Sequence, residues 1–219
     1  MILDERLTTY INSLDQGNTA FLDALEREAI ADHVPIIRRE TQSLLKLLLA
    51  VKKPMRILEV GTAVGFSALL MAEYAPKGAH ITTIENYEKR IPVAEGNFRQ
   101  AGREGQIALI AGDAAEVLRE LTGLFDLIFL DAAKGQYIRF LPELLRLLEE
   151  DGLLVSDNVL QEGDILESRF AVTRRDRTIH KRMREYLYEL THCTGLVTTI
   201  LPVGDGVTVS VKCKERNLL

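Results

Sequence analysis

The amino-acid sequence predicts an α/β fold built on a mainly parallel, doubly wound sheet with helices on both faces. From about residue 56 onward, short apolar β-type runs alternate with amphipathic helical stretches. Such alternation is typical of right-handed βαβ units. The strand candidates are almost continuously apolar, as expected when helices cover both faces of a sheet. The chain has 219 residues, enough for one such domain, and its length does not require a second.

The first fifty residues are predicted to be helical. Residues 19–33 (TAFLDALEREAIADH) and residues 38–51 (RRETQSLLKLLLAV) each carry apolar side chains at helical spacing. The apolar stripes consist of Phe21, Leu22, Leu25 and Ile30, and of Leu44, Leu45, Leu48 and Leu49. Lys53-Pro54 then interrupts the pattern. We therefore expect a single domain, residues 1–219, in which residues 1–52 form a helical cover on a core of residues 53–219.

Seven strands are predicted within that core. The candidates are residues 56–61, 80–85, 107–112, 125–131, 152–157, 196–204 and 206–212. Helical segments lie between the first five, at residues 65–75, 86–102, 113–123 and 136–150. The last two strands are separated only by a turn at Gly204, Asp205 and Gly206. They are therefore expected to form an antiparallel hairpin at the edge of the sheet.

A glycine-containing loop follows the first predicted strand, in residues 57–67 (ILEVGTAVGFS). Gly61 and Gly65 permit a tight turn and a close approach of a ligand to the backbone. In open α/β sheets, ligands bind outside the carboxyl ends of the strands. The loop lacks the G-x-G-x-x-G pattern of dinucleotide sites, which disfavours an NAD-dependent enzyme. Glu59 is expected to face the pocket with a negative charge, which suits a cationic ligand.

Two further strand ends supply polar residues. Glu85 lies twenty residues after Gly65, where an acid can accept hydrogen bonds from ribose hydroxyls. Asp113 and Ala114 follow the third strand, where an adenine edge could be read. The alternative is that the glycines form an ordinary βα turn and the acids are solvated strand ends. Taken together, the set favours a cationic, nucleoside-like ligand: S-adenosylmethionine.

The motifs LEVGTAVGFSALLMA, TTIE, GDA, FDLIFLDAAKGQY and GLLVSDNVL together resemble the class I methyltransferases of the metal-dependent, catechol O-methyltransferase-like family. The resemblance runs from about residue 40 to residue 212. It implies a Rossmann-like doubly wound sheet of seven strands, mainly parallel with an antiparallel last strand, and S-adenosylmethionine as the methyl donor. The predicted cofactor-binding residues are Ile37, Glu59, Gly61, Gly65, Ser67, Glu85, Asp113, Ala114 and Asp131. In the family, the segment around Ile37 closes over the cofactor.

Polar side chains also end the fourth and fifth predicted strands. Asp131, Asp157 and Asn158 offer only oxygen ligands, which Mg²⁺ prefers. Zinc would require His or Cys, and none of the four histidines lies in these motifs. The resemblance assigns the metal to the positions matching these three residues. The alternative is that the two aspartates are caps after strands.

Lys134 lies one short turn after Asp131. A bound divalent metal favours the ionised form of an acceptor hydroxyl, and its charge also favours a neutral amine on a nearby lysine. In the family, the lysine matching Lys134 is the general base. By itself, Lys134 would be an ordinary surface lysine. Tyr137 is expected to pack rather than to take part in chemistry.

The acceptor is predicted to carry two adjacent oxygens. Catechols, caffeoyl-type phenols and 5-hydroxyuridine in tRNA all meet this requirement. Residues 168–190 favour RNA, since seven Arg and Lys residues lie between Arg169 and Arg184 in a chain of net charge -5. If this segment is helical, Arg174, Arg177, Lys181 and Arg184 form one stripe that could bind the phosphates of an anticodon loop. The segment and the closing LPVGDGVTVSVK also resemble the bacterial tRNA 5-hydroxyuridine methyltransferase branch.

The sequence therefore predicts a Mg²⁺- and S-adenosylmethionine-dependent O-methyltransferase that converts 5-hydroxyuridine at the tRNA wobble position to 5-methoxyuridine. The predicted tRNA-binding residues are Arg38, Arg174, Arg175, Arg177, Lys181 and Arg184. A small-molecule methyltransferase for catechol or caffeoyl-type hydroxyls is the alternative, followed by a non-catalytic binding module. The basic segment could instead pair with a dimer partner, and a homodimer is expected.

The N-terminal segment has early acidic residues, unlike a signal peptide, and no apolar run approaches the ~18 residues that cross a bilayer. The two cysteines, Cys193 and Cys213, have no metal-type spacing and are expected to be buried thiols in a reducing compartment. We therefore expect a cytoplasmic protein with no membrane partner.

Overall fold

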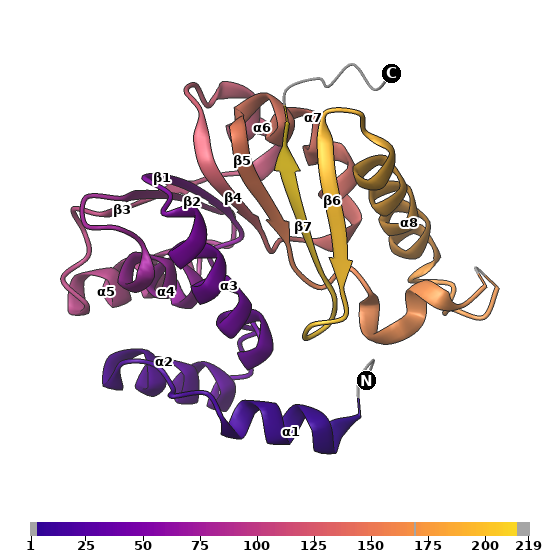
Figure 1. Ribbon diagram of the computed structural model, residues 1–219. Coiled ribbons are helices and arrows are strands. Elements are labelled where there is room, and N and C mark those ends of the chain that lie inside the picture. The colour runs from indigo at the N-terminus through magenta and orange to yellow at the C-terminus, as the bar shows by residue number, and fades with distance from the viewer. Residues whose placement is uncertain (1–3, 169, 214–219) are drawn as a thin grey trace.

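The computed structural model describes residues 4–168 and 170–213, so Arg169 of the basic segment lies outside the described residues. Its centre is a seven-stranded sheet in the order β3-β2-β1-β4-β5-β7-β6 (Figure 1). The strands are β1 (Arg56–Val60), β2 (His80–Glu85), β3 (Ile107–Ala111), β4 (Phe125–Leu130), β5 (Leu148–Ser156), β6 (Leu196–Leu201) and β7 (Val207–Lys212). Strands β1 to β5 pair in parallel, whereas β7 is antiparallel to both β5 and β6. The predicted fold class is confirmed.

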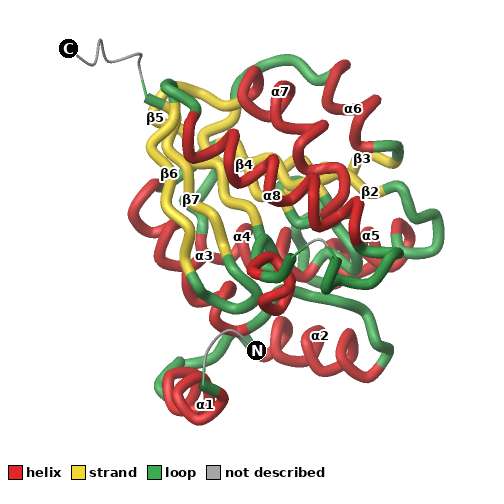
Figure 2. Tube along the Cα trace, turned by 90° about the vertical axis from the view of Figure 1, so that its right-hand side faces the viewer, coloured by secondary structure: helices red, strands yellow, loops and turns green. Residues whose placement is uncertain are grey.

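Helices cover both faces of this sheet (Figure 2). One apolar layer joins the sheet to α2 (Ala20–Ala31), α3 (Arg39–Lys52), α4 (Phe66–Tyr74) and α5 (Ile91–Gln100). The opposite layer joins it to α6 (Ala114–Glu120), α7 (Tyr137–Leu147) and α8 (Arg177–His192). Helix α1 (Glu5–Ser13) has no buried residue. It lies next to α2 and away from the strands (Figure 1). Two short 3-10 turns, Lys134–Gln136 and Gln161–Leu166, border the carboxyl ends of the strands.

The topological switch point of the sheet lies between β1 and β4. On one side of it the chain runs outward from β1 to β2 and β3, and on the other side it runs outward from β4 to β5. Backbone hydrogen bonds continue past the ends of these strands. The Asp131 amide donates to the Val60 carbonyl at 3.0 Å, and the Asp157 amide donates to the Leu130 carbonyl at 3.0 Å. The first residues after β1, β4 and β5 are therefore held together at one edge, where doubly wound sheets bind ligands.

Three details differ from the sequence-based expectation. Strand β5 begins at Leu148, because a bulge with Asp151 at φ 58° lets Leu148 pair with Phe125 before the main ladder begins at Leu153. Helix α8 begins at Arg177, since Thr173 Oγ1 donates to Asp176 Oδ2 at 2.5 Å and forms a turn before it. Ile30 is 60% exposed and lies outside the buried stripe of α2.

No helix in residues 4–168 and 170–213 combines the length and the apolar character needed to cross a bilayer. Cys193 and Cys213 are free thiols, and both are half-buried rather than buried.

Candidate active site

A cavity of about 1020 Å³ opens at the carboxyl edge of the sheet. Its walls come from the segments that follow the five parallel strands, together with the segment before α3 and the first turn of α8. The predicted cofactor residues in the wall are Ile37, Gly61, Ser67, Glu85, Asp113, Ala114 and Asp131. Residues distant in the sequence are thus brought to one site, as the strand-end pattern predicts.

The loop after β1 depends on its two glycines. Gly61 has φ 102°, and a Cβ there would lie 2.0 Å from the Asp131 carbonyl oxygen. Only glycine therefore lets the end of β1 lie against the end of β4. Gly65 has φ 85°, and a Cβ there would lie 2.5 Å from the Phe98 ring. Gly65 is not in the cavity wall, so its direct effect is to shape the loop and the start of α4.

Glu85 is held in a fixed orientation at the end of β2. Its Oε2 accepts a hydrogen bond from the Ala63 amide at 2.8 Å, and Oε1 accepts from the amides of Asn86 and Tyr87 at 3.0 and 2.9 Å. Carboxylate oxygens have further lone pairs, so this side chain can still accept bonds from two hydroxyls of a ligand. Glu85 as a whole is 8% exposed, and it lines the cavity. This geometry fits the predicted ribose contact.

Glu59 does not lie where the sequence argument expected it, and this prediction is corrected. The residue is fully buried behind the loop and is not part of the cavity wall. Its Oε2 accepts a bond from Thr83 Oγ1 at 2.5 Å. Burial raises the pKa of Glu59 to about 8, although hydrogen bonds from Ser67 and Thr83 act in the opposite direction. The side chain is therefore mostly neutral at pH 7 and contributes no negative charge to the pocket.

The three predicted metal ligands follow β4 and β5. Asp157 is 1% exposed; its Oδ1 accepts bonds from the Asn158 amide at 2.8 Å and from Thr41 Oγ1 at 3.3 Å. Its Oδ2 is buried with no hydrogen-bond partner among the described residues. Asp131 and Asn158 line the cavity beside it.

The electrostatics of this cluster favour a cation. Burial raises the pKa of Asp131 to about 6, and Lys134 acts against this rise. Burial and the charge of Asp131 raise the pKa of Asp157 to about 7. A buried acid, Asp157, with an unpartnered Oδ2, and a half-buried acid, Asp131, beside it therefore fit a hard cation such as Mg²⁺. In the described part of the chain no three His, Cys, Asp or Glu side chains form a metal-sized group, so a metal held here would need a further ligand such as the Asn158 amide oxygen.

Lys134 lies in the cavity wall near Asp131. Its Nζ is 3.3 Å from Asp205 Oδ2, in an ion pair whose acid is 3% exposed and whose lysine is 34% exposed. Asp205 was predicted only as part of a turn, because its contact with Lys134 spans 71 residues. Tyr137 is fully buried, with its hydroxyl 3.3 Å from the Leu130 carbonyl and 3.1 Å from the Asp157 carbonyl.

Comparison with known proteins identifies the family of the chain. Residues 12–213 match the family model described as O-methyltransferase. The chain belongs to the O-methyltransferase family. The predicted enzyme class is therefore confirmed.

This O-methyltransferase resembles proteins from bacteria and fungi. It is 36% identical over 127 residues to the catechol O-methyltransferase of Niastella koreensis, a match spanning 56% of the chain and 58% of that relative. A solved Staphylococcus aureus protein, described as a candidate caffeoyl-CoA O-methyltransferase, superposes with a TM-score of 0.87 at 32% identity, covering 95% of this chain and 100% of that one. The Podospora anserina methyltransferase PaMTH1, solved with SAH bound, gives 0.84 at 28% identity over 96% and 94%.

The basic residues of the methyltransferase do not form the continuous stripe that the sequence predicts. Arg174 and Arg175 are exposed and precede α8, and neither makes an ion pair with a described residue. The Arg177 guanidinium lies 5.8 Å from the centre of the Phe170 ring and is half-buried.

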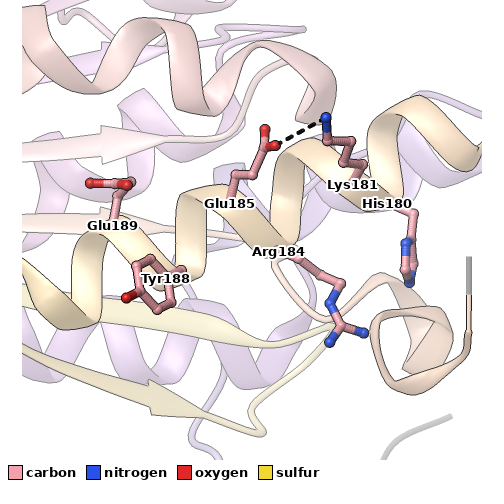
Figure 3. A pocket seen from close by; sticks show the side chains of 6 residues that line it. All are labelled: His180, Lys181, Arg184, Glu185, Tyr188 and Glu189. Atoms are coloured by element: carbon pink, nitrogen blue, oxygen red, sulfur yellow. Dashed lines mark ion pairs between the residues drawn. The ribbon is translucent and has the colours of Figure 1, made fainter.

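The remaining three basic residues are already engaged. Arg38 lines the cavity, and its Nη2 lies 2.6 Å from Glu162 Oε1. Lys181 pairs with Glu185 at 3.4 Å, and Arg184 donates to the Ile165 carbonyl at 3.3 Å. Lys181 and Arg184 border a separate groove of about 420 Å³ on α8, which also contains Glu185 and Glu189 (Figure 3). Of the six predicted tRNA-binding residues, Arg174 and Arg175 are therefore the exposed ones whose side chains make neither an ion pair nor a hydrogen bond with a described residue, next to a cavity whose wall also contains Arg38, Arg90 and Lys134.

Proposed function

We propose that this chain transfers the methyl group of S-adenosylmethionine, with Mg²⁺, to the 5-hydroxyl of 5-hydroxyuridine at the wobble position of tRNA, giving 5-methoxyuridine. The observation that carries the methyl-transfer part is the meeting of three features at one edge of the sheet. These are the cavity, the acid pair with the unpartnered Asp157 Oδ2, and the amine of Lys134.

The methyl donor is supported by the wall of the cavity. Glu85 presents an oriented carboxylate for the ribose hydroxyls, and Asp113 and Ala114 lie beside it at the start of α6. The same wall also contains the apolar side chain of Ile37 and the small side chain of Ser67. The Podospora anserina relative binds SAH, the product left when S-adenosylmethionine loses its methyl group. A molecule of this size fits a cavity of about 1020 Å³.

Asp131, Asp157 and Asn158 would hold Mg²⁺. When bound, the ion supplies positive charge that favours the ionised form of an acceptor hydroxyl. The side chains of the protein carry out the remaining steps. Lys134 Nζ accepts the hydroxyl proton, and the acceptor oxygen forms its bond to the methyl carbon as the carbon–sulfur bond breaks. The walls of the cavity align the donor with the acceptor, which accounts for much of the acceleration.

The choice of tRNA as the acceptor is supported by the position of the free basic residues. Asp176, Ile179 and His180 line the cavity, and Arg174 and Arg175 immediately precede them. Two exposed guanidinium groups near the mouth could bind phosphates that flank a nucleotide inserted into the cavity. The alternative acceptor is a small phenol with adjacent hydroxyls, favoured by the likeness to a catechol O-methyltransferase.

Methyl transfer from labelled S-adenosylmethionine distinguishes these acceptors. The enzyme is incubated with tRNA carrying 5-hydroxyuridine, with catechol, or with caffeoyl-CoA, each with Mg²⁺ or with EDTA. We expect label in 5-methoxyuridine after digestion of the tRNA, and none with EDTA. Label only in catechol or caffeoyl-CoA would replace the tRNA acceptor by the small-molecule one. Full activity in EDTA would rule out the metal.

A further inference from the structure

Asp205 lies in the turn between β6 and β7 and is almost completely buried, at 2% exposure. Both oxygens of its carboxylate are occupied. Oδ2 is 3.3 Å from the Lys134 amine, and Oδ1 accepts a short hydrogen bond from the Glu162 amide. A buried carboxylate is costly without a cation or donors, so these two contacts account for its charge.

The turn itself does not depend on this side chain. The Gly206 amide donates to the Val203 carbonyl at 2.8 Å, and the backbone carbonyl of Asp205 accepts from the Leu160 amide at 3.0 Å. Gly204 and Gly206 supply the two left-handed residues of the turn, with φ 58° and 85°. Backbone hydrogen bonds and glycines are sufficient to close the turn. The Asp205 carboxylate is therefore available for its contacts with Lys134 and Glu162.

Two acids compete for the Lys134 amine. Asp131 attracts it electrostatically from the end of β4, and Asp205 pairs with it from the hairpin. Asp157 from β5 is the next charged group, and it interacts with both of those acids. A lysine drawn onto Asp131 would compete for an oxygen that the metal site needs. The ion pair with Asp205 holds the amine away from that oxygen.

We propose that Asp205 is a positioning residue that holds the Lys134 amine at the cavity wall and apart from Asp131. The inference rests on the proposed function in one respect only, the role of Lys134 as the base. The ion pair itself can be tested without turnover. Glu162 and Arg38 belong to the same network, since the Glu162 amide bonds to Asp205 while its side chain pairs with Arg38.

The direct test is the reactivity of individual lysines. Wild type, Asp205→Asn and Asp205→Glu are acetylated briefly across a pH series, and each lysine is quantified by peptide mass spectrometry. Only the neutral amine reacts, so the midpoint pH reports how strongly the ammonium form is held. We expect Lys134 to react at lower pH in Asp205→Asn, because the amine has lost its ion-pair partner, and to return toward the wild-type behaviour in Asp205→Glu.

Lys46 offers a matched control. Its amine lies 3.5 Å from Asp15 Oδ1 in a half-buried pair within the N-terminal helices. Asp15→Asn should lower the Lys46 midpoint and leave that of Lys134 unchanged. An unchanged Lys134 midpoint in a folded Asp205→Asn variant would overturn the proposal.

Turnover provides the second readout. Asp205→Asn should reduce kcat at least ~10-fold, leave the affinity for S-adenosylhomocysteine within about twofold, and move the rising limb of the pH–rate profile to lower pH. A purely structural role would reduce the rate without moving that limb. In Lys134→Ala, Asp205→Asn should have no further effect on rate. A midpoint shift without methyl transfer by the wild type would uphold the ion pair and reject the proposed function.

If Asp205→Asn does not fold, the pair is tested from the lysine side. Lys134→Arg preserves a cation for Asp205, whereas Lys134→Ala leaves the buried acid unpaired. We expect the melting temperature of Lys134→Arg to be clearly above that of Lys134→Ala. Equal melting temperatures would overturn the proposal.

Discussion

Glu59 couples the stability of the protein to pH. Its folded pKa of about 8 lies above its unfolded value, because burial opposes ionisation. The associated stability is complete below the unfolded pKa of 4.5 and is lost as the pH rises through the folded value. A carboxylic acid placed behind the cofactor loop is therefore most favourable in its neutral form.

Glu59→Gln should remove most of this pH dependence. Glutamine keeps the shape and the acceptor for Thr83 but cannot ionise, so it should be more stable than wild type at pH 9 and similar at pH 5. Urea unfolding at a series of pH values measures this. The idea fails if wild type and variant lose free energy of unfolding in parallel between pH 5 and pH 9.

Lys134→Ala tests the base. Turnover should fall at least ~100-fold, because no other described amine lines the cavity beside Asp131. Binding of S-adenosylhomocysteine, measured by calorimetry, should remain close to that of wild type because the cofactor contacts come from other segments. Unchanged turnover would show that proton removal does not depend on this lysine.

Among the structural elements, β4 and β5 depend on α7 for the alignment of their ends. The Tyr137 hydroxyl, at the start of α7, can donate to the last carbonyl of β4 or to that of Asp157 just after β5. The ring also meets Tyr186 of α8 edge-on, with the ring centres 5.5 Å apart. Tyr137 therefore braces the segments that carry both acids of the proposed metal site, in agreement with the packing role expected from the sequence.

Tyr137→Phe should reduce the free energy of unfolding by about 1 kcal/mol or somewhat more, since one buried hydrogen bond is lost and the ring is kept. The concentration of Mn²⁺ or Mg²⁺ needed for half-maximal activity should rise as the two acids lose their alignment. Tyr188→Phe, on the exposed face of α8, is the control and should change neither quantity. A variant with wild-type stability and metal dependence would contradict this bracing role.

The seven strands and the helices between them could be predicted because each is a local pattern of apolar spacing. The meeting of the strand-end residues at one cavity could also be predicted, since parallel strands bring their carboxyl ends to one edge. The position of Glu59 was predicted wrongly, because its side chain turns away from the cavity and bonds to Thr83 of β2. The sequence of β1 alone does not reveal this contact with a neighbouring strand. The contact between Asp205 and Lys134 could not be read from a pattern, because it joins the hairpin to a turn 71 residues away.

At the scale of the whole molecule, charge is unevenly distributed. The net charge is -5, yet Arg174 and Arg175 are exposed next to the segment that lines the cavity. The total charge therefore opposes general binding to nucleic acids, whereas a local pair of cations could still guide one phosphate backbone to the cavity.

Replacing Arg174 and Arg175 by alanine should weaken tRNA binding and reduce the slope of log affinity against log salt by up to ~2. Lys77→Ala with Arg119→Ala, two exposed cations away from the cavity wall, is the charge-matched control and should leave the slope in place. Methylation of catechol should be unchanged in both. Equal slopes in the two double variants would remove the basic segment from tRNA recognition.

The position of β7 has a consequence for the order of assembly during synthesis. Among the seven described strands this one comes last in chain order, yet it is inserted between β5 and β6 and begins two residues after Asp205. The nascent chain can therefore complete the cofactor half of the sheet, β1 to β4, well before its final hairpin emerges from the ribosome. The ion pair with Lys134 forms only when that hairpin docks. The cofactor side of the site can thus form early, whereas the Lys134–Asp205 pair has to wait for the synthesis of the hairpin.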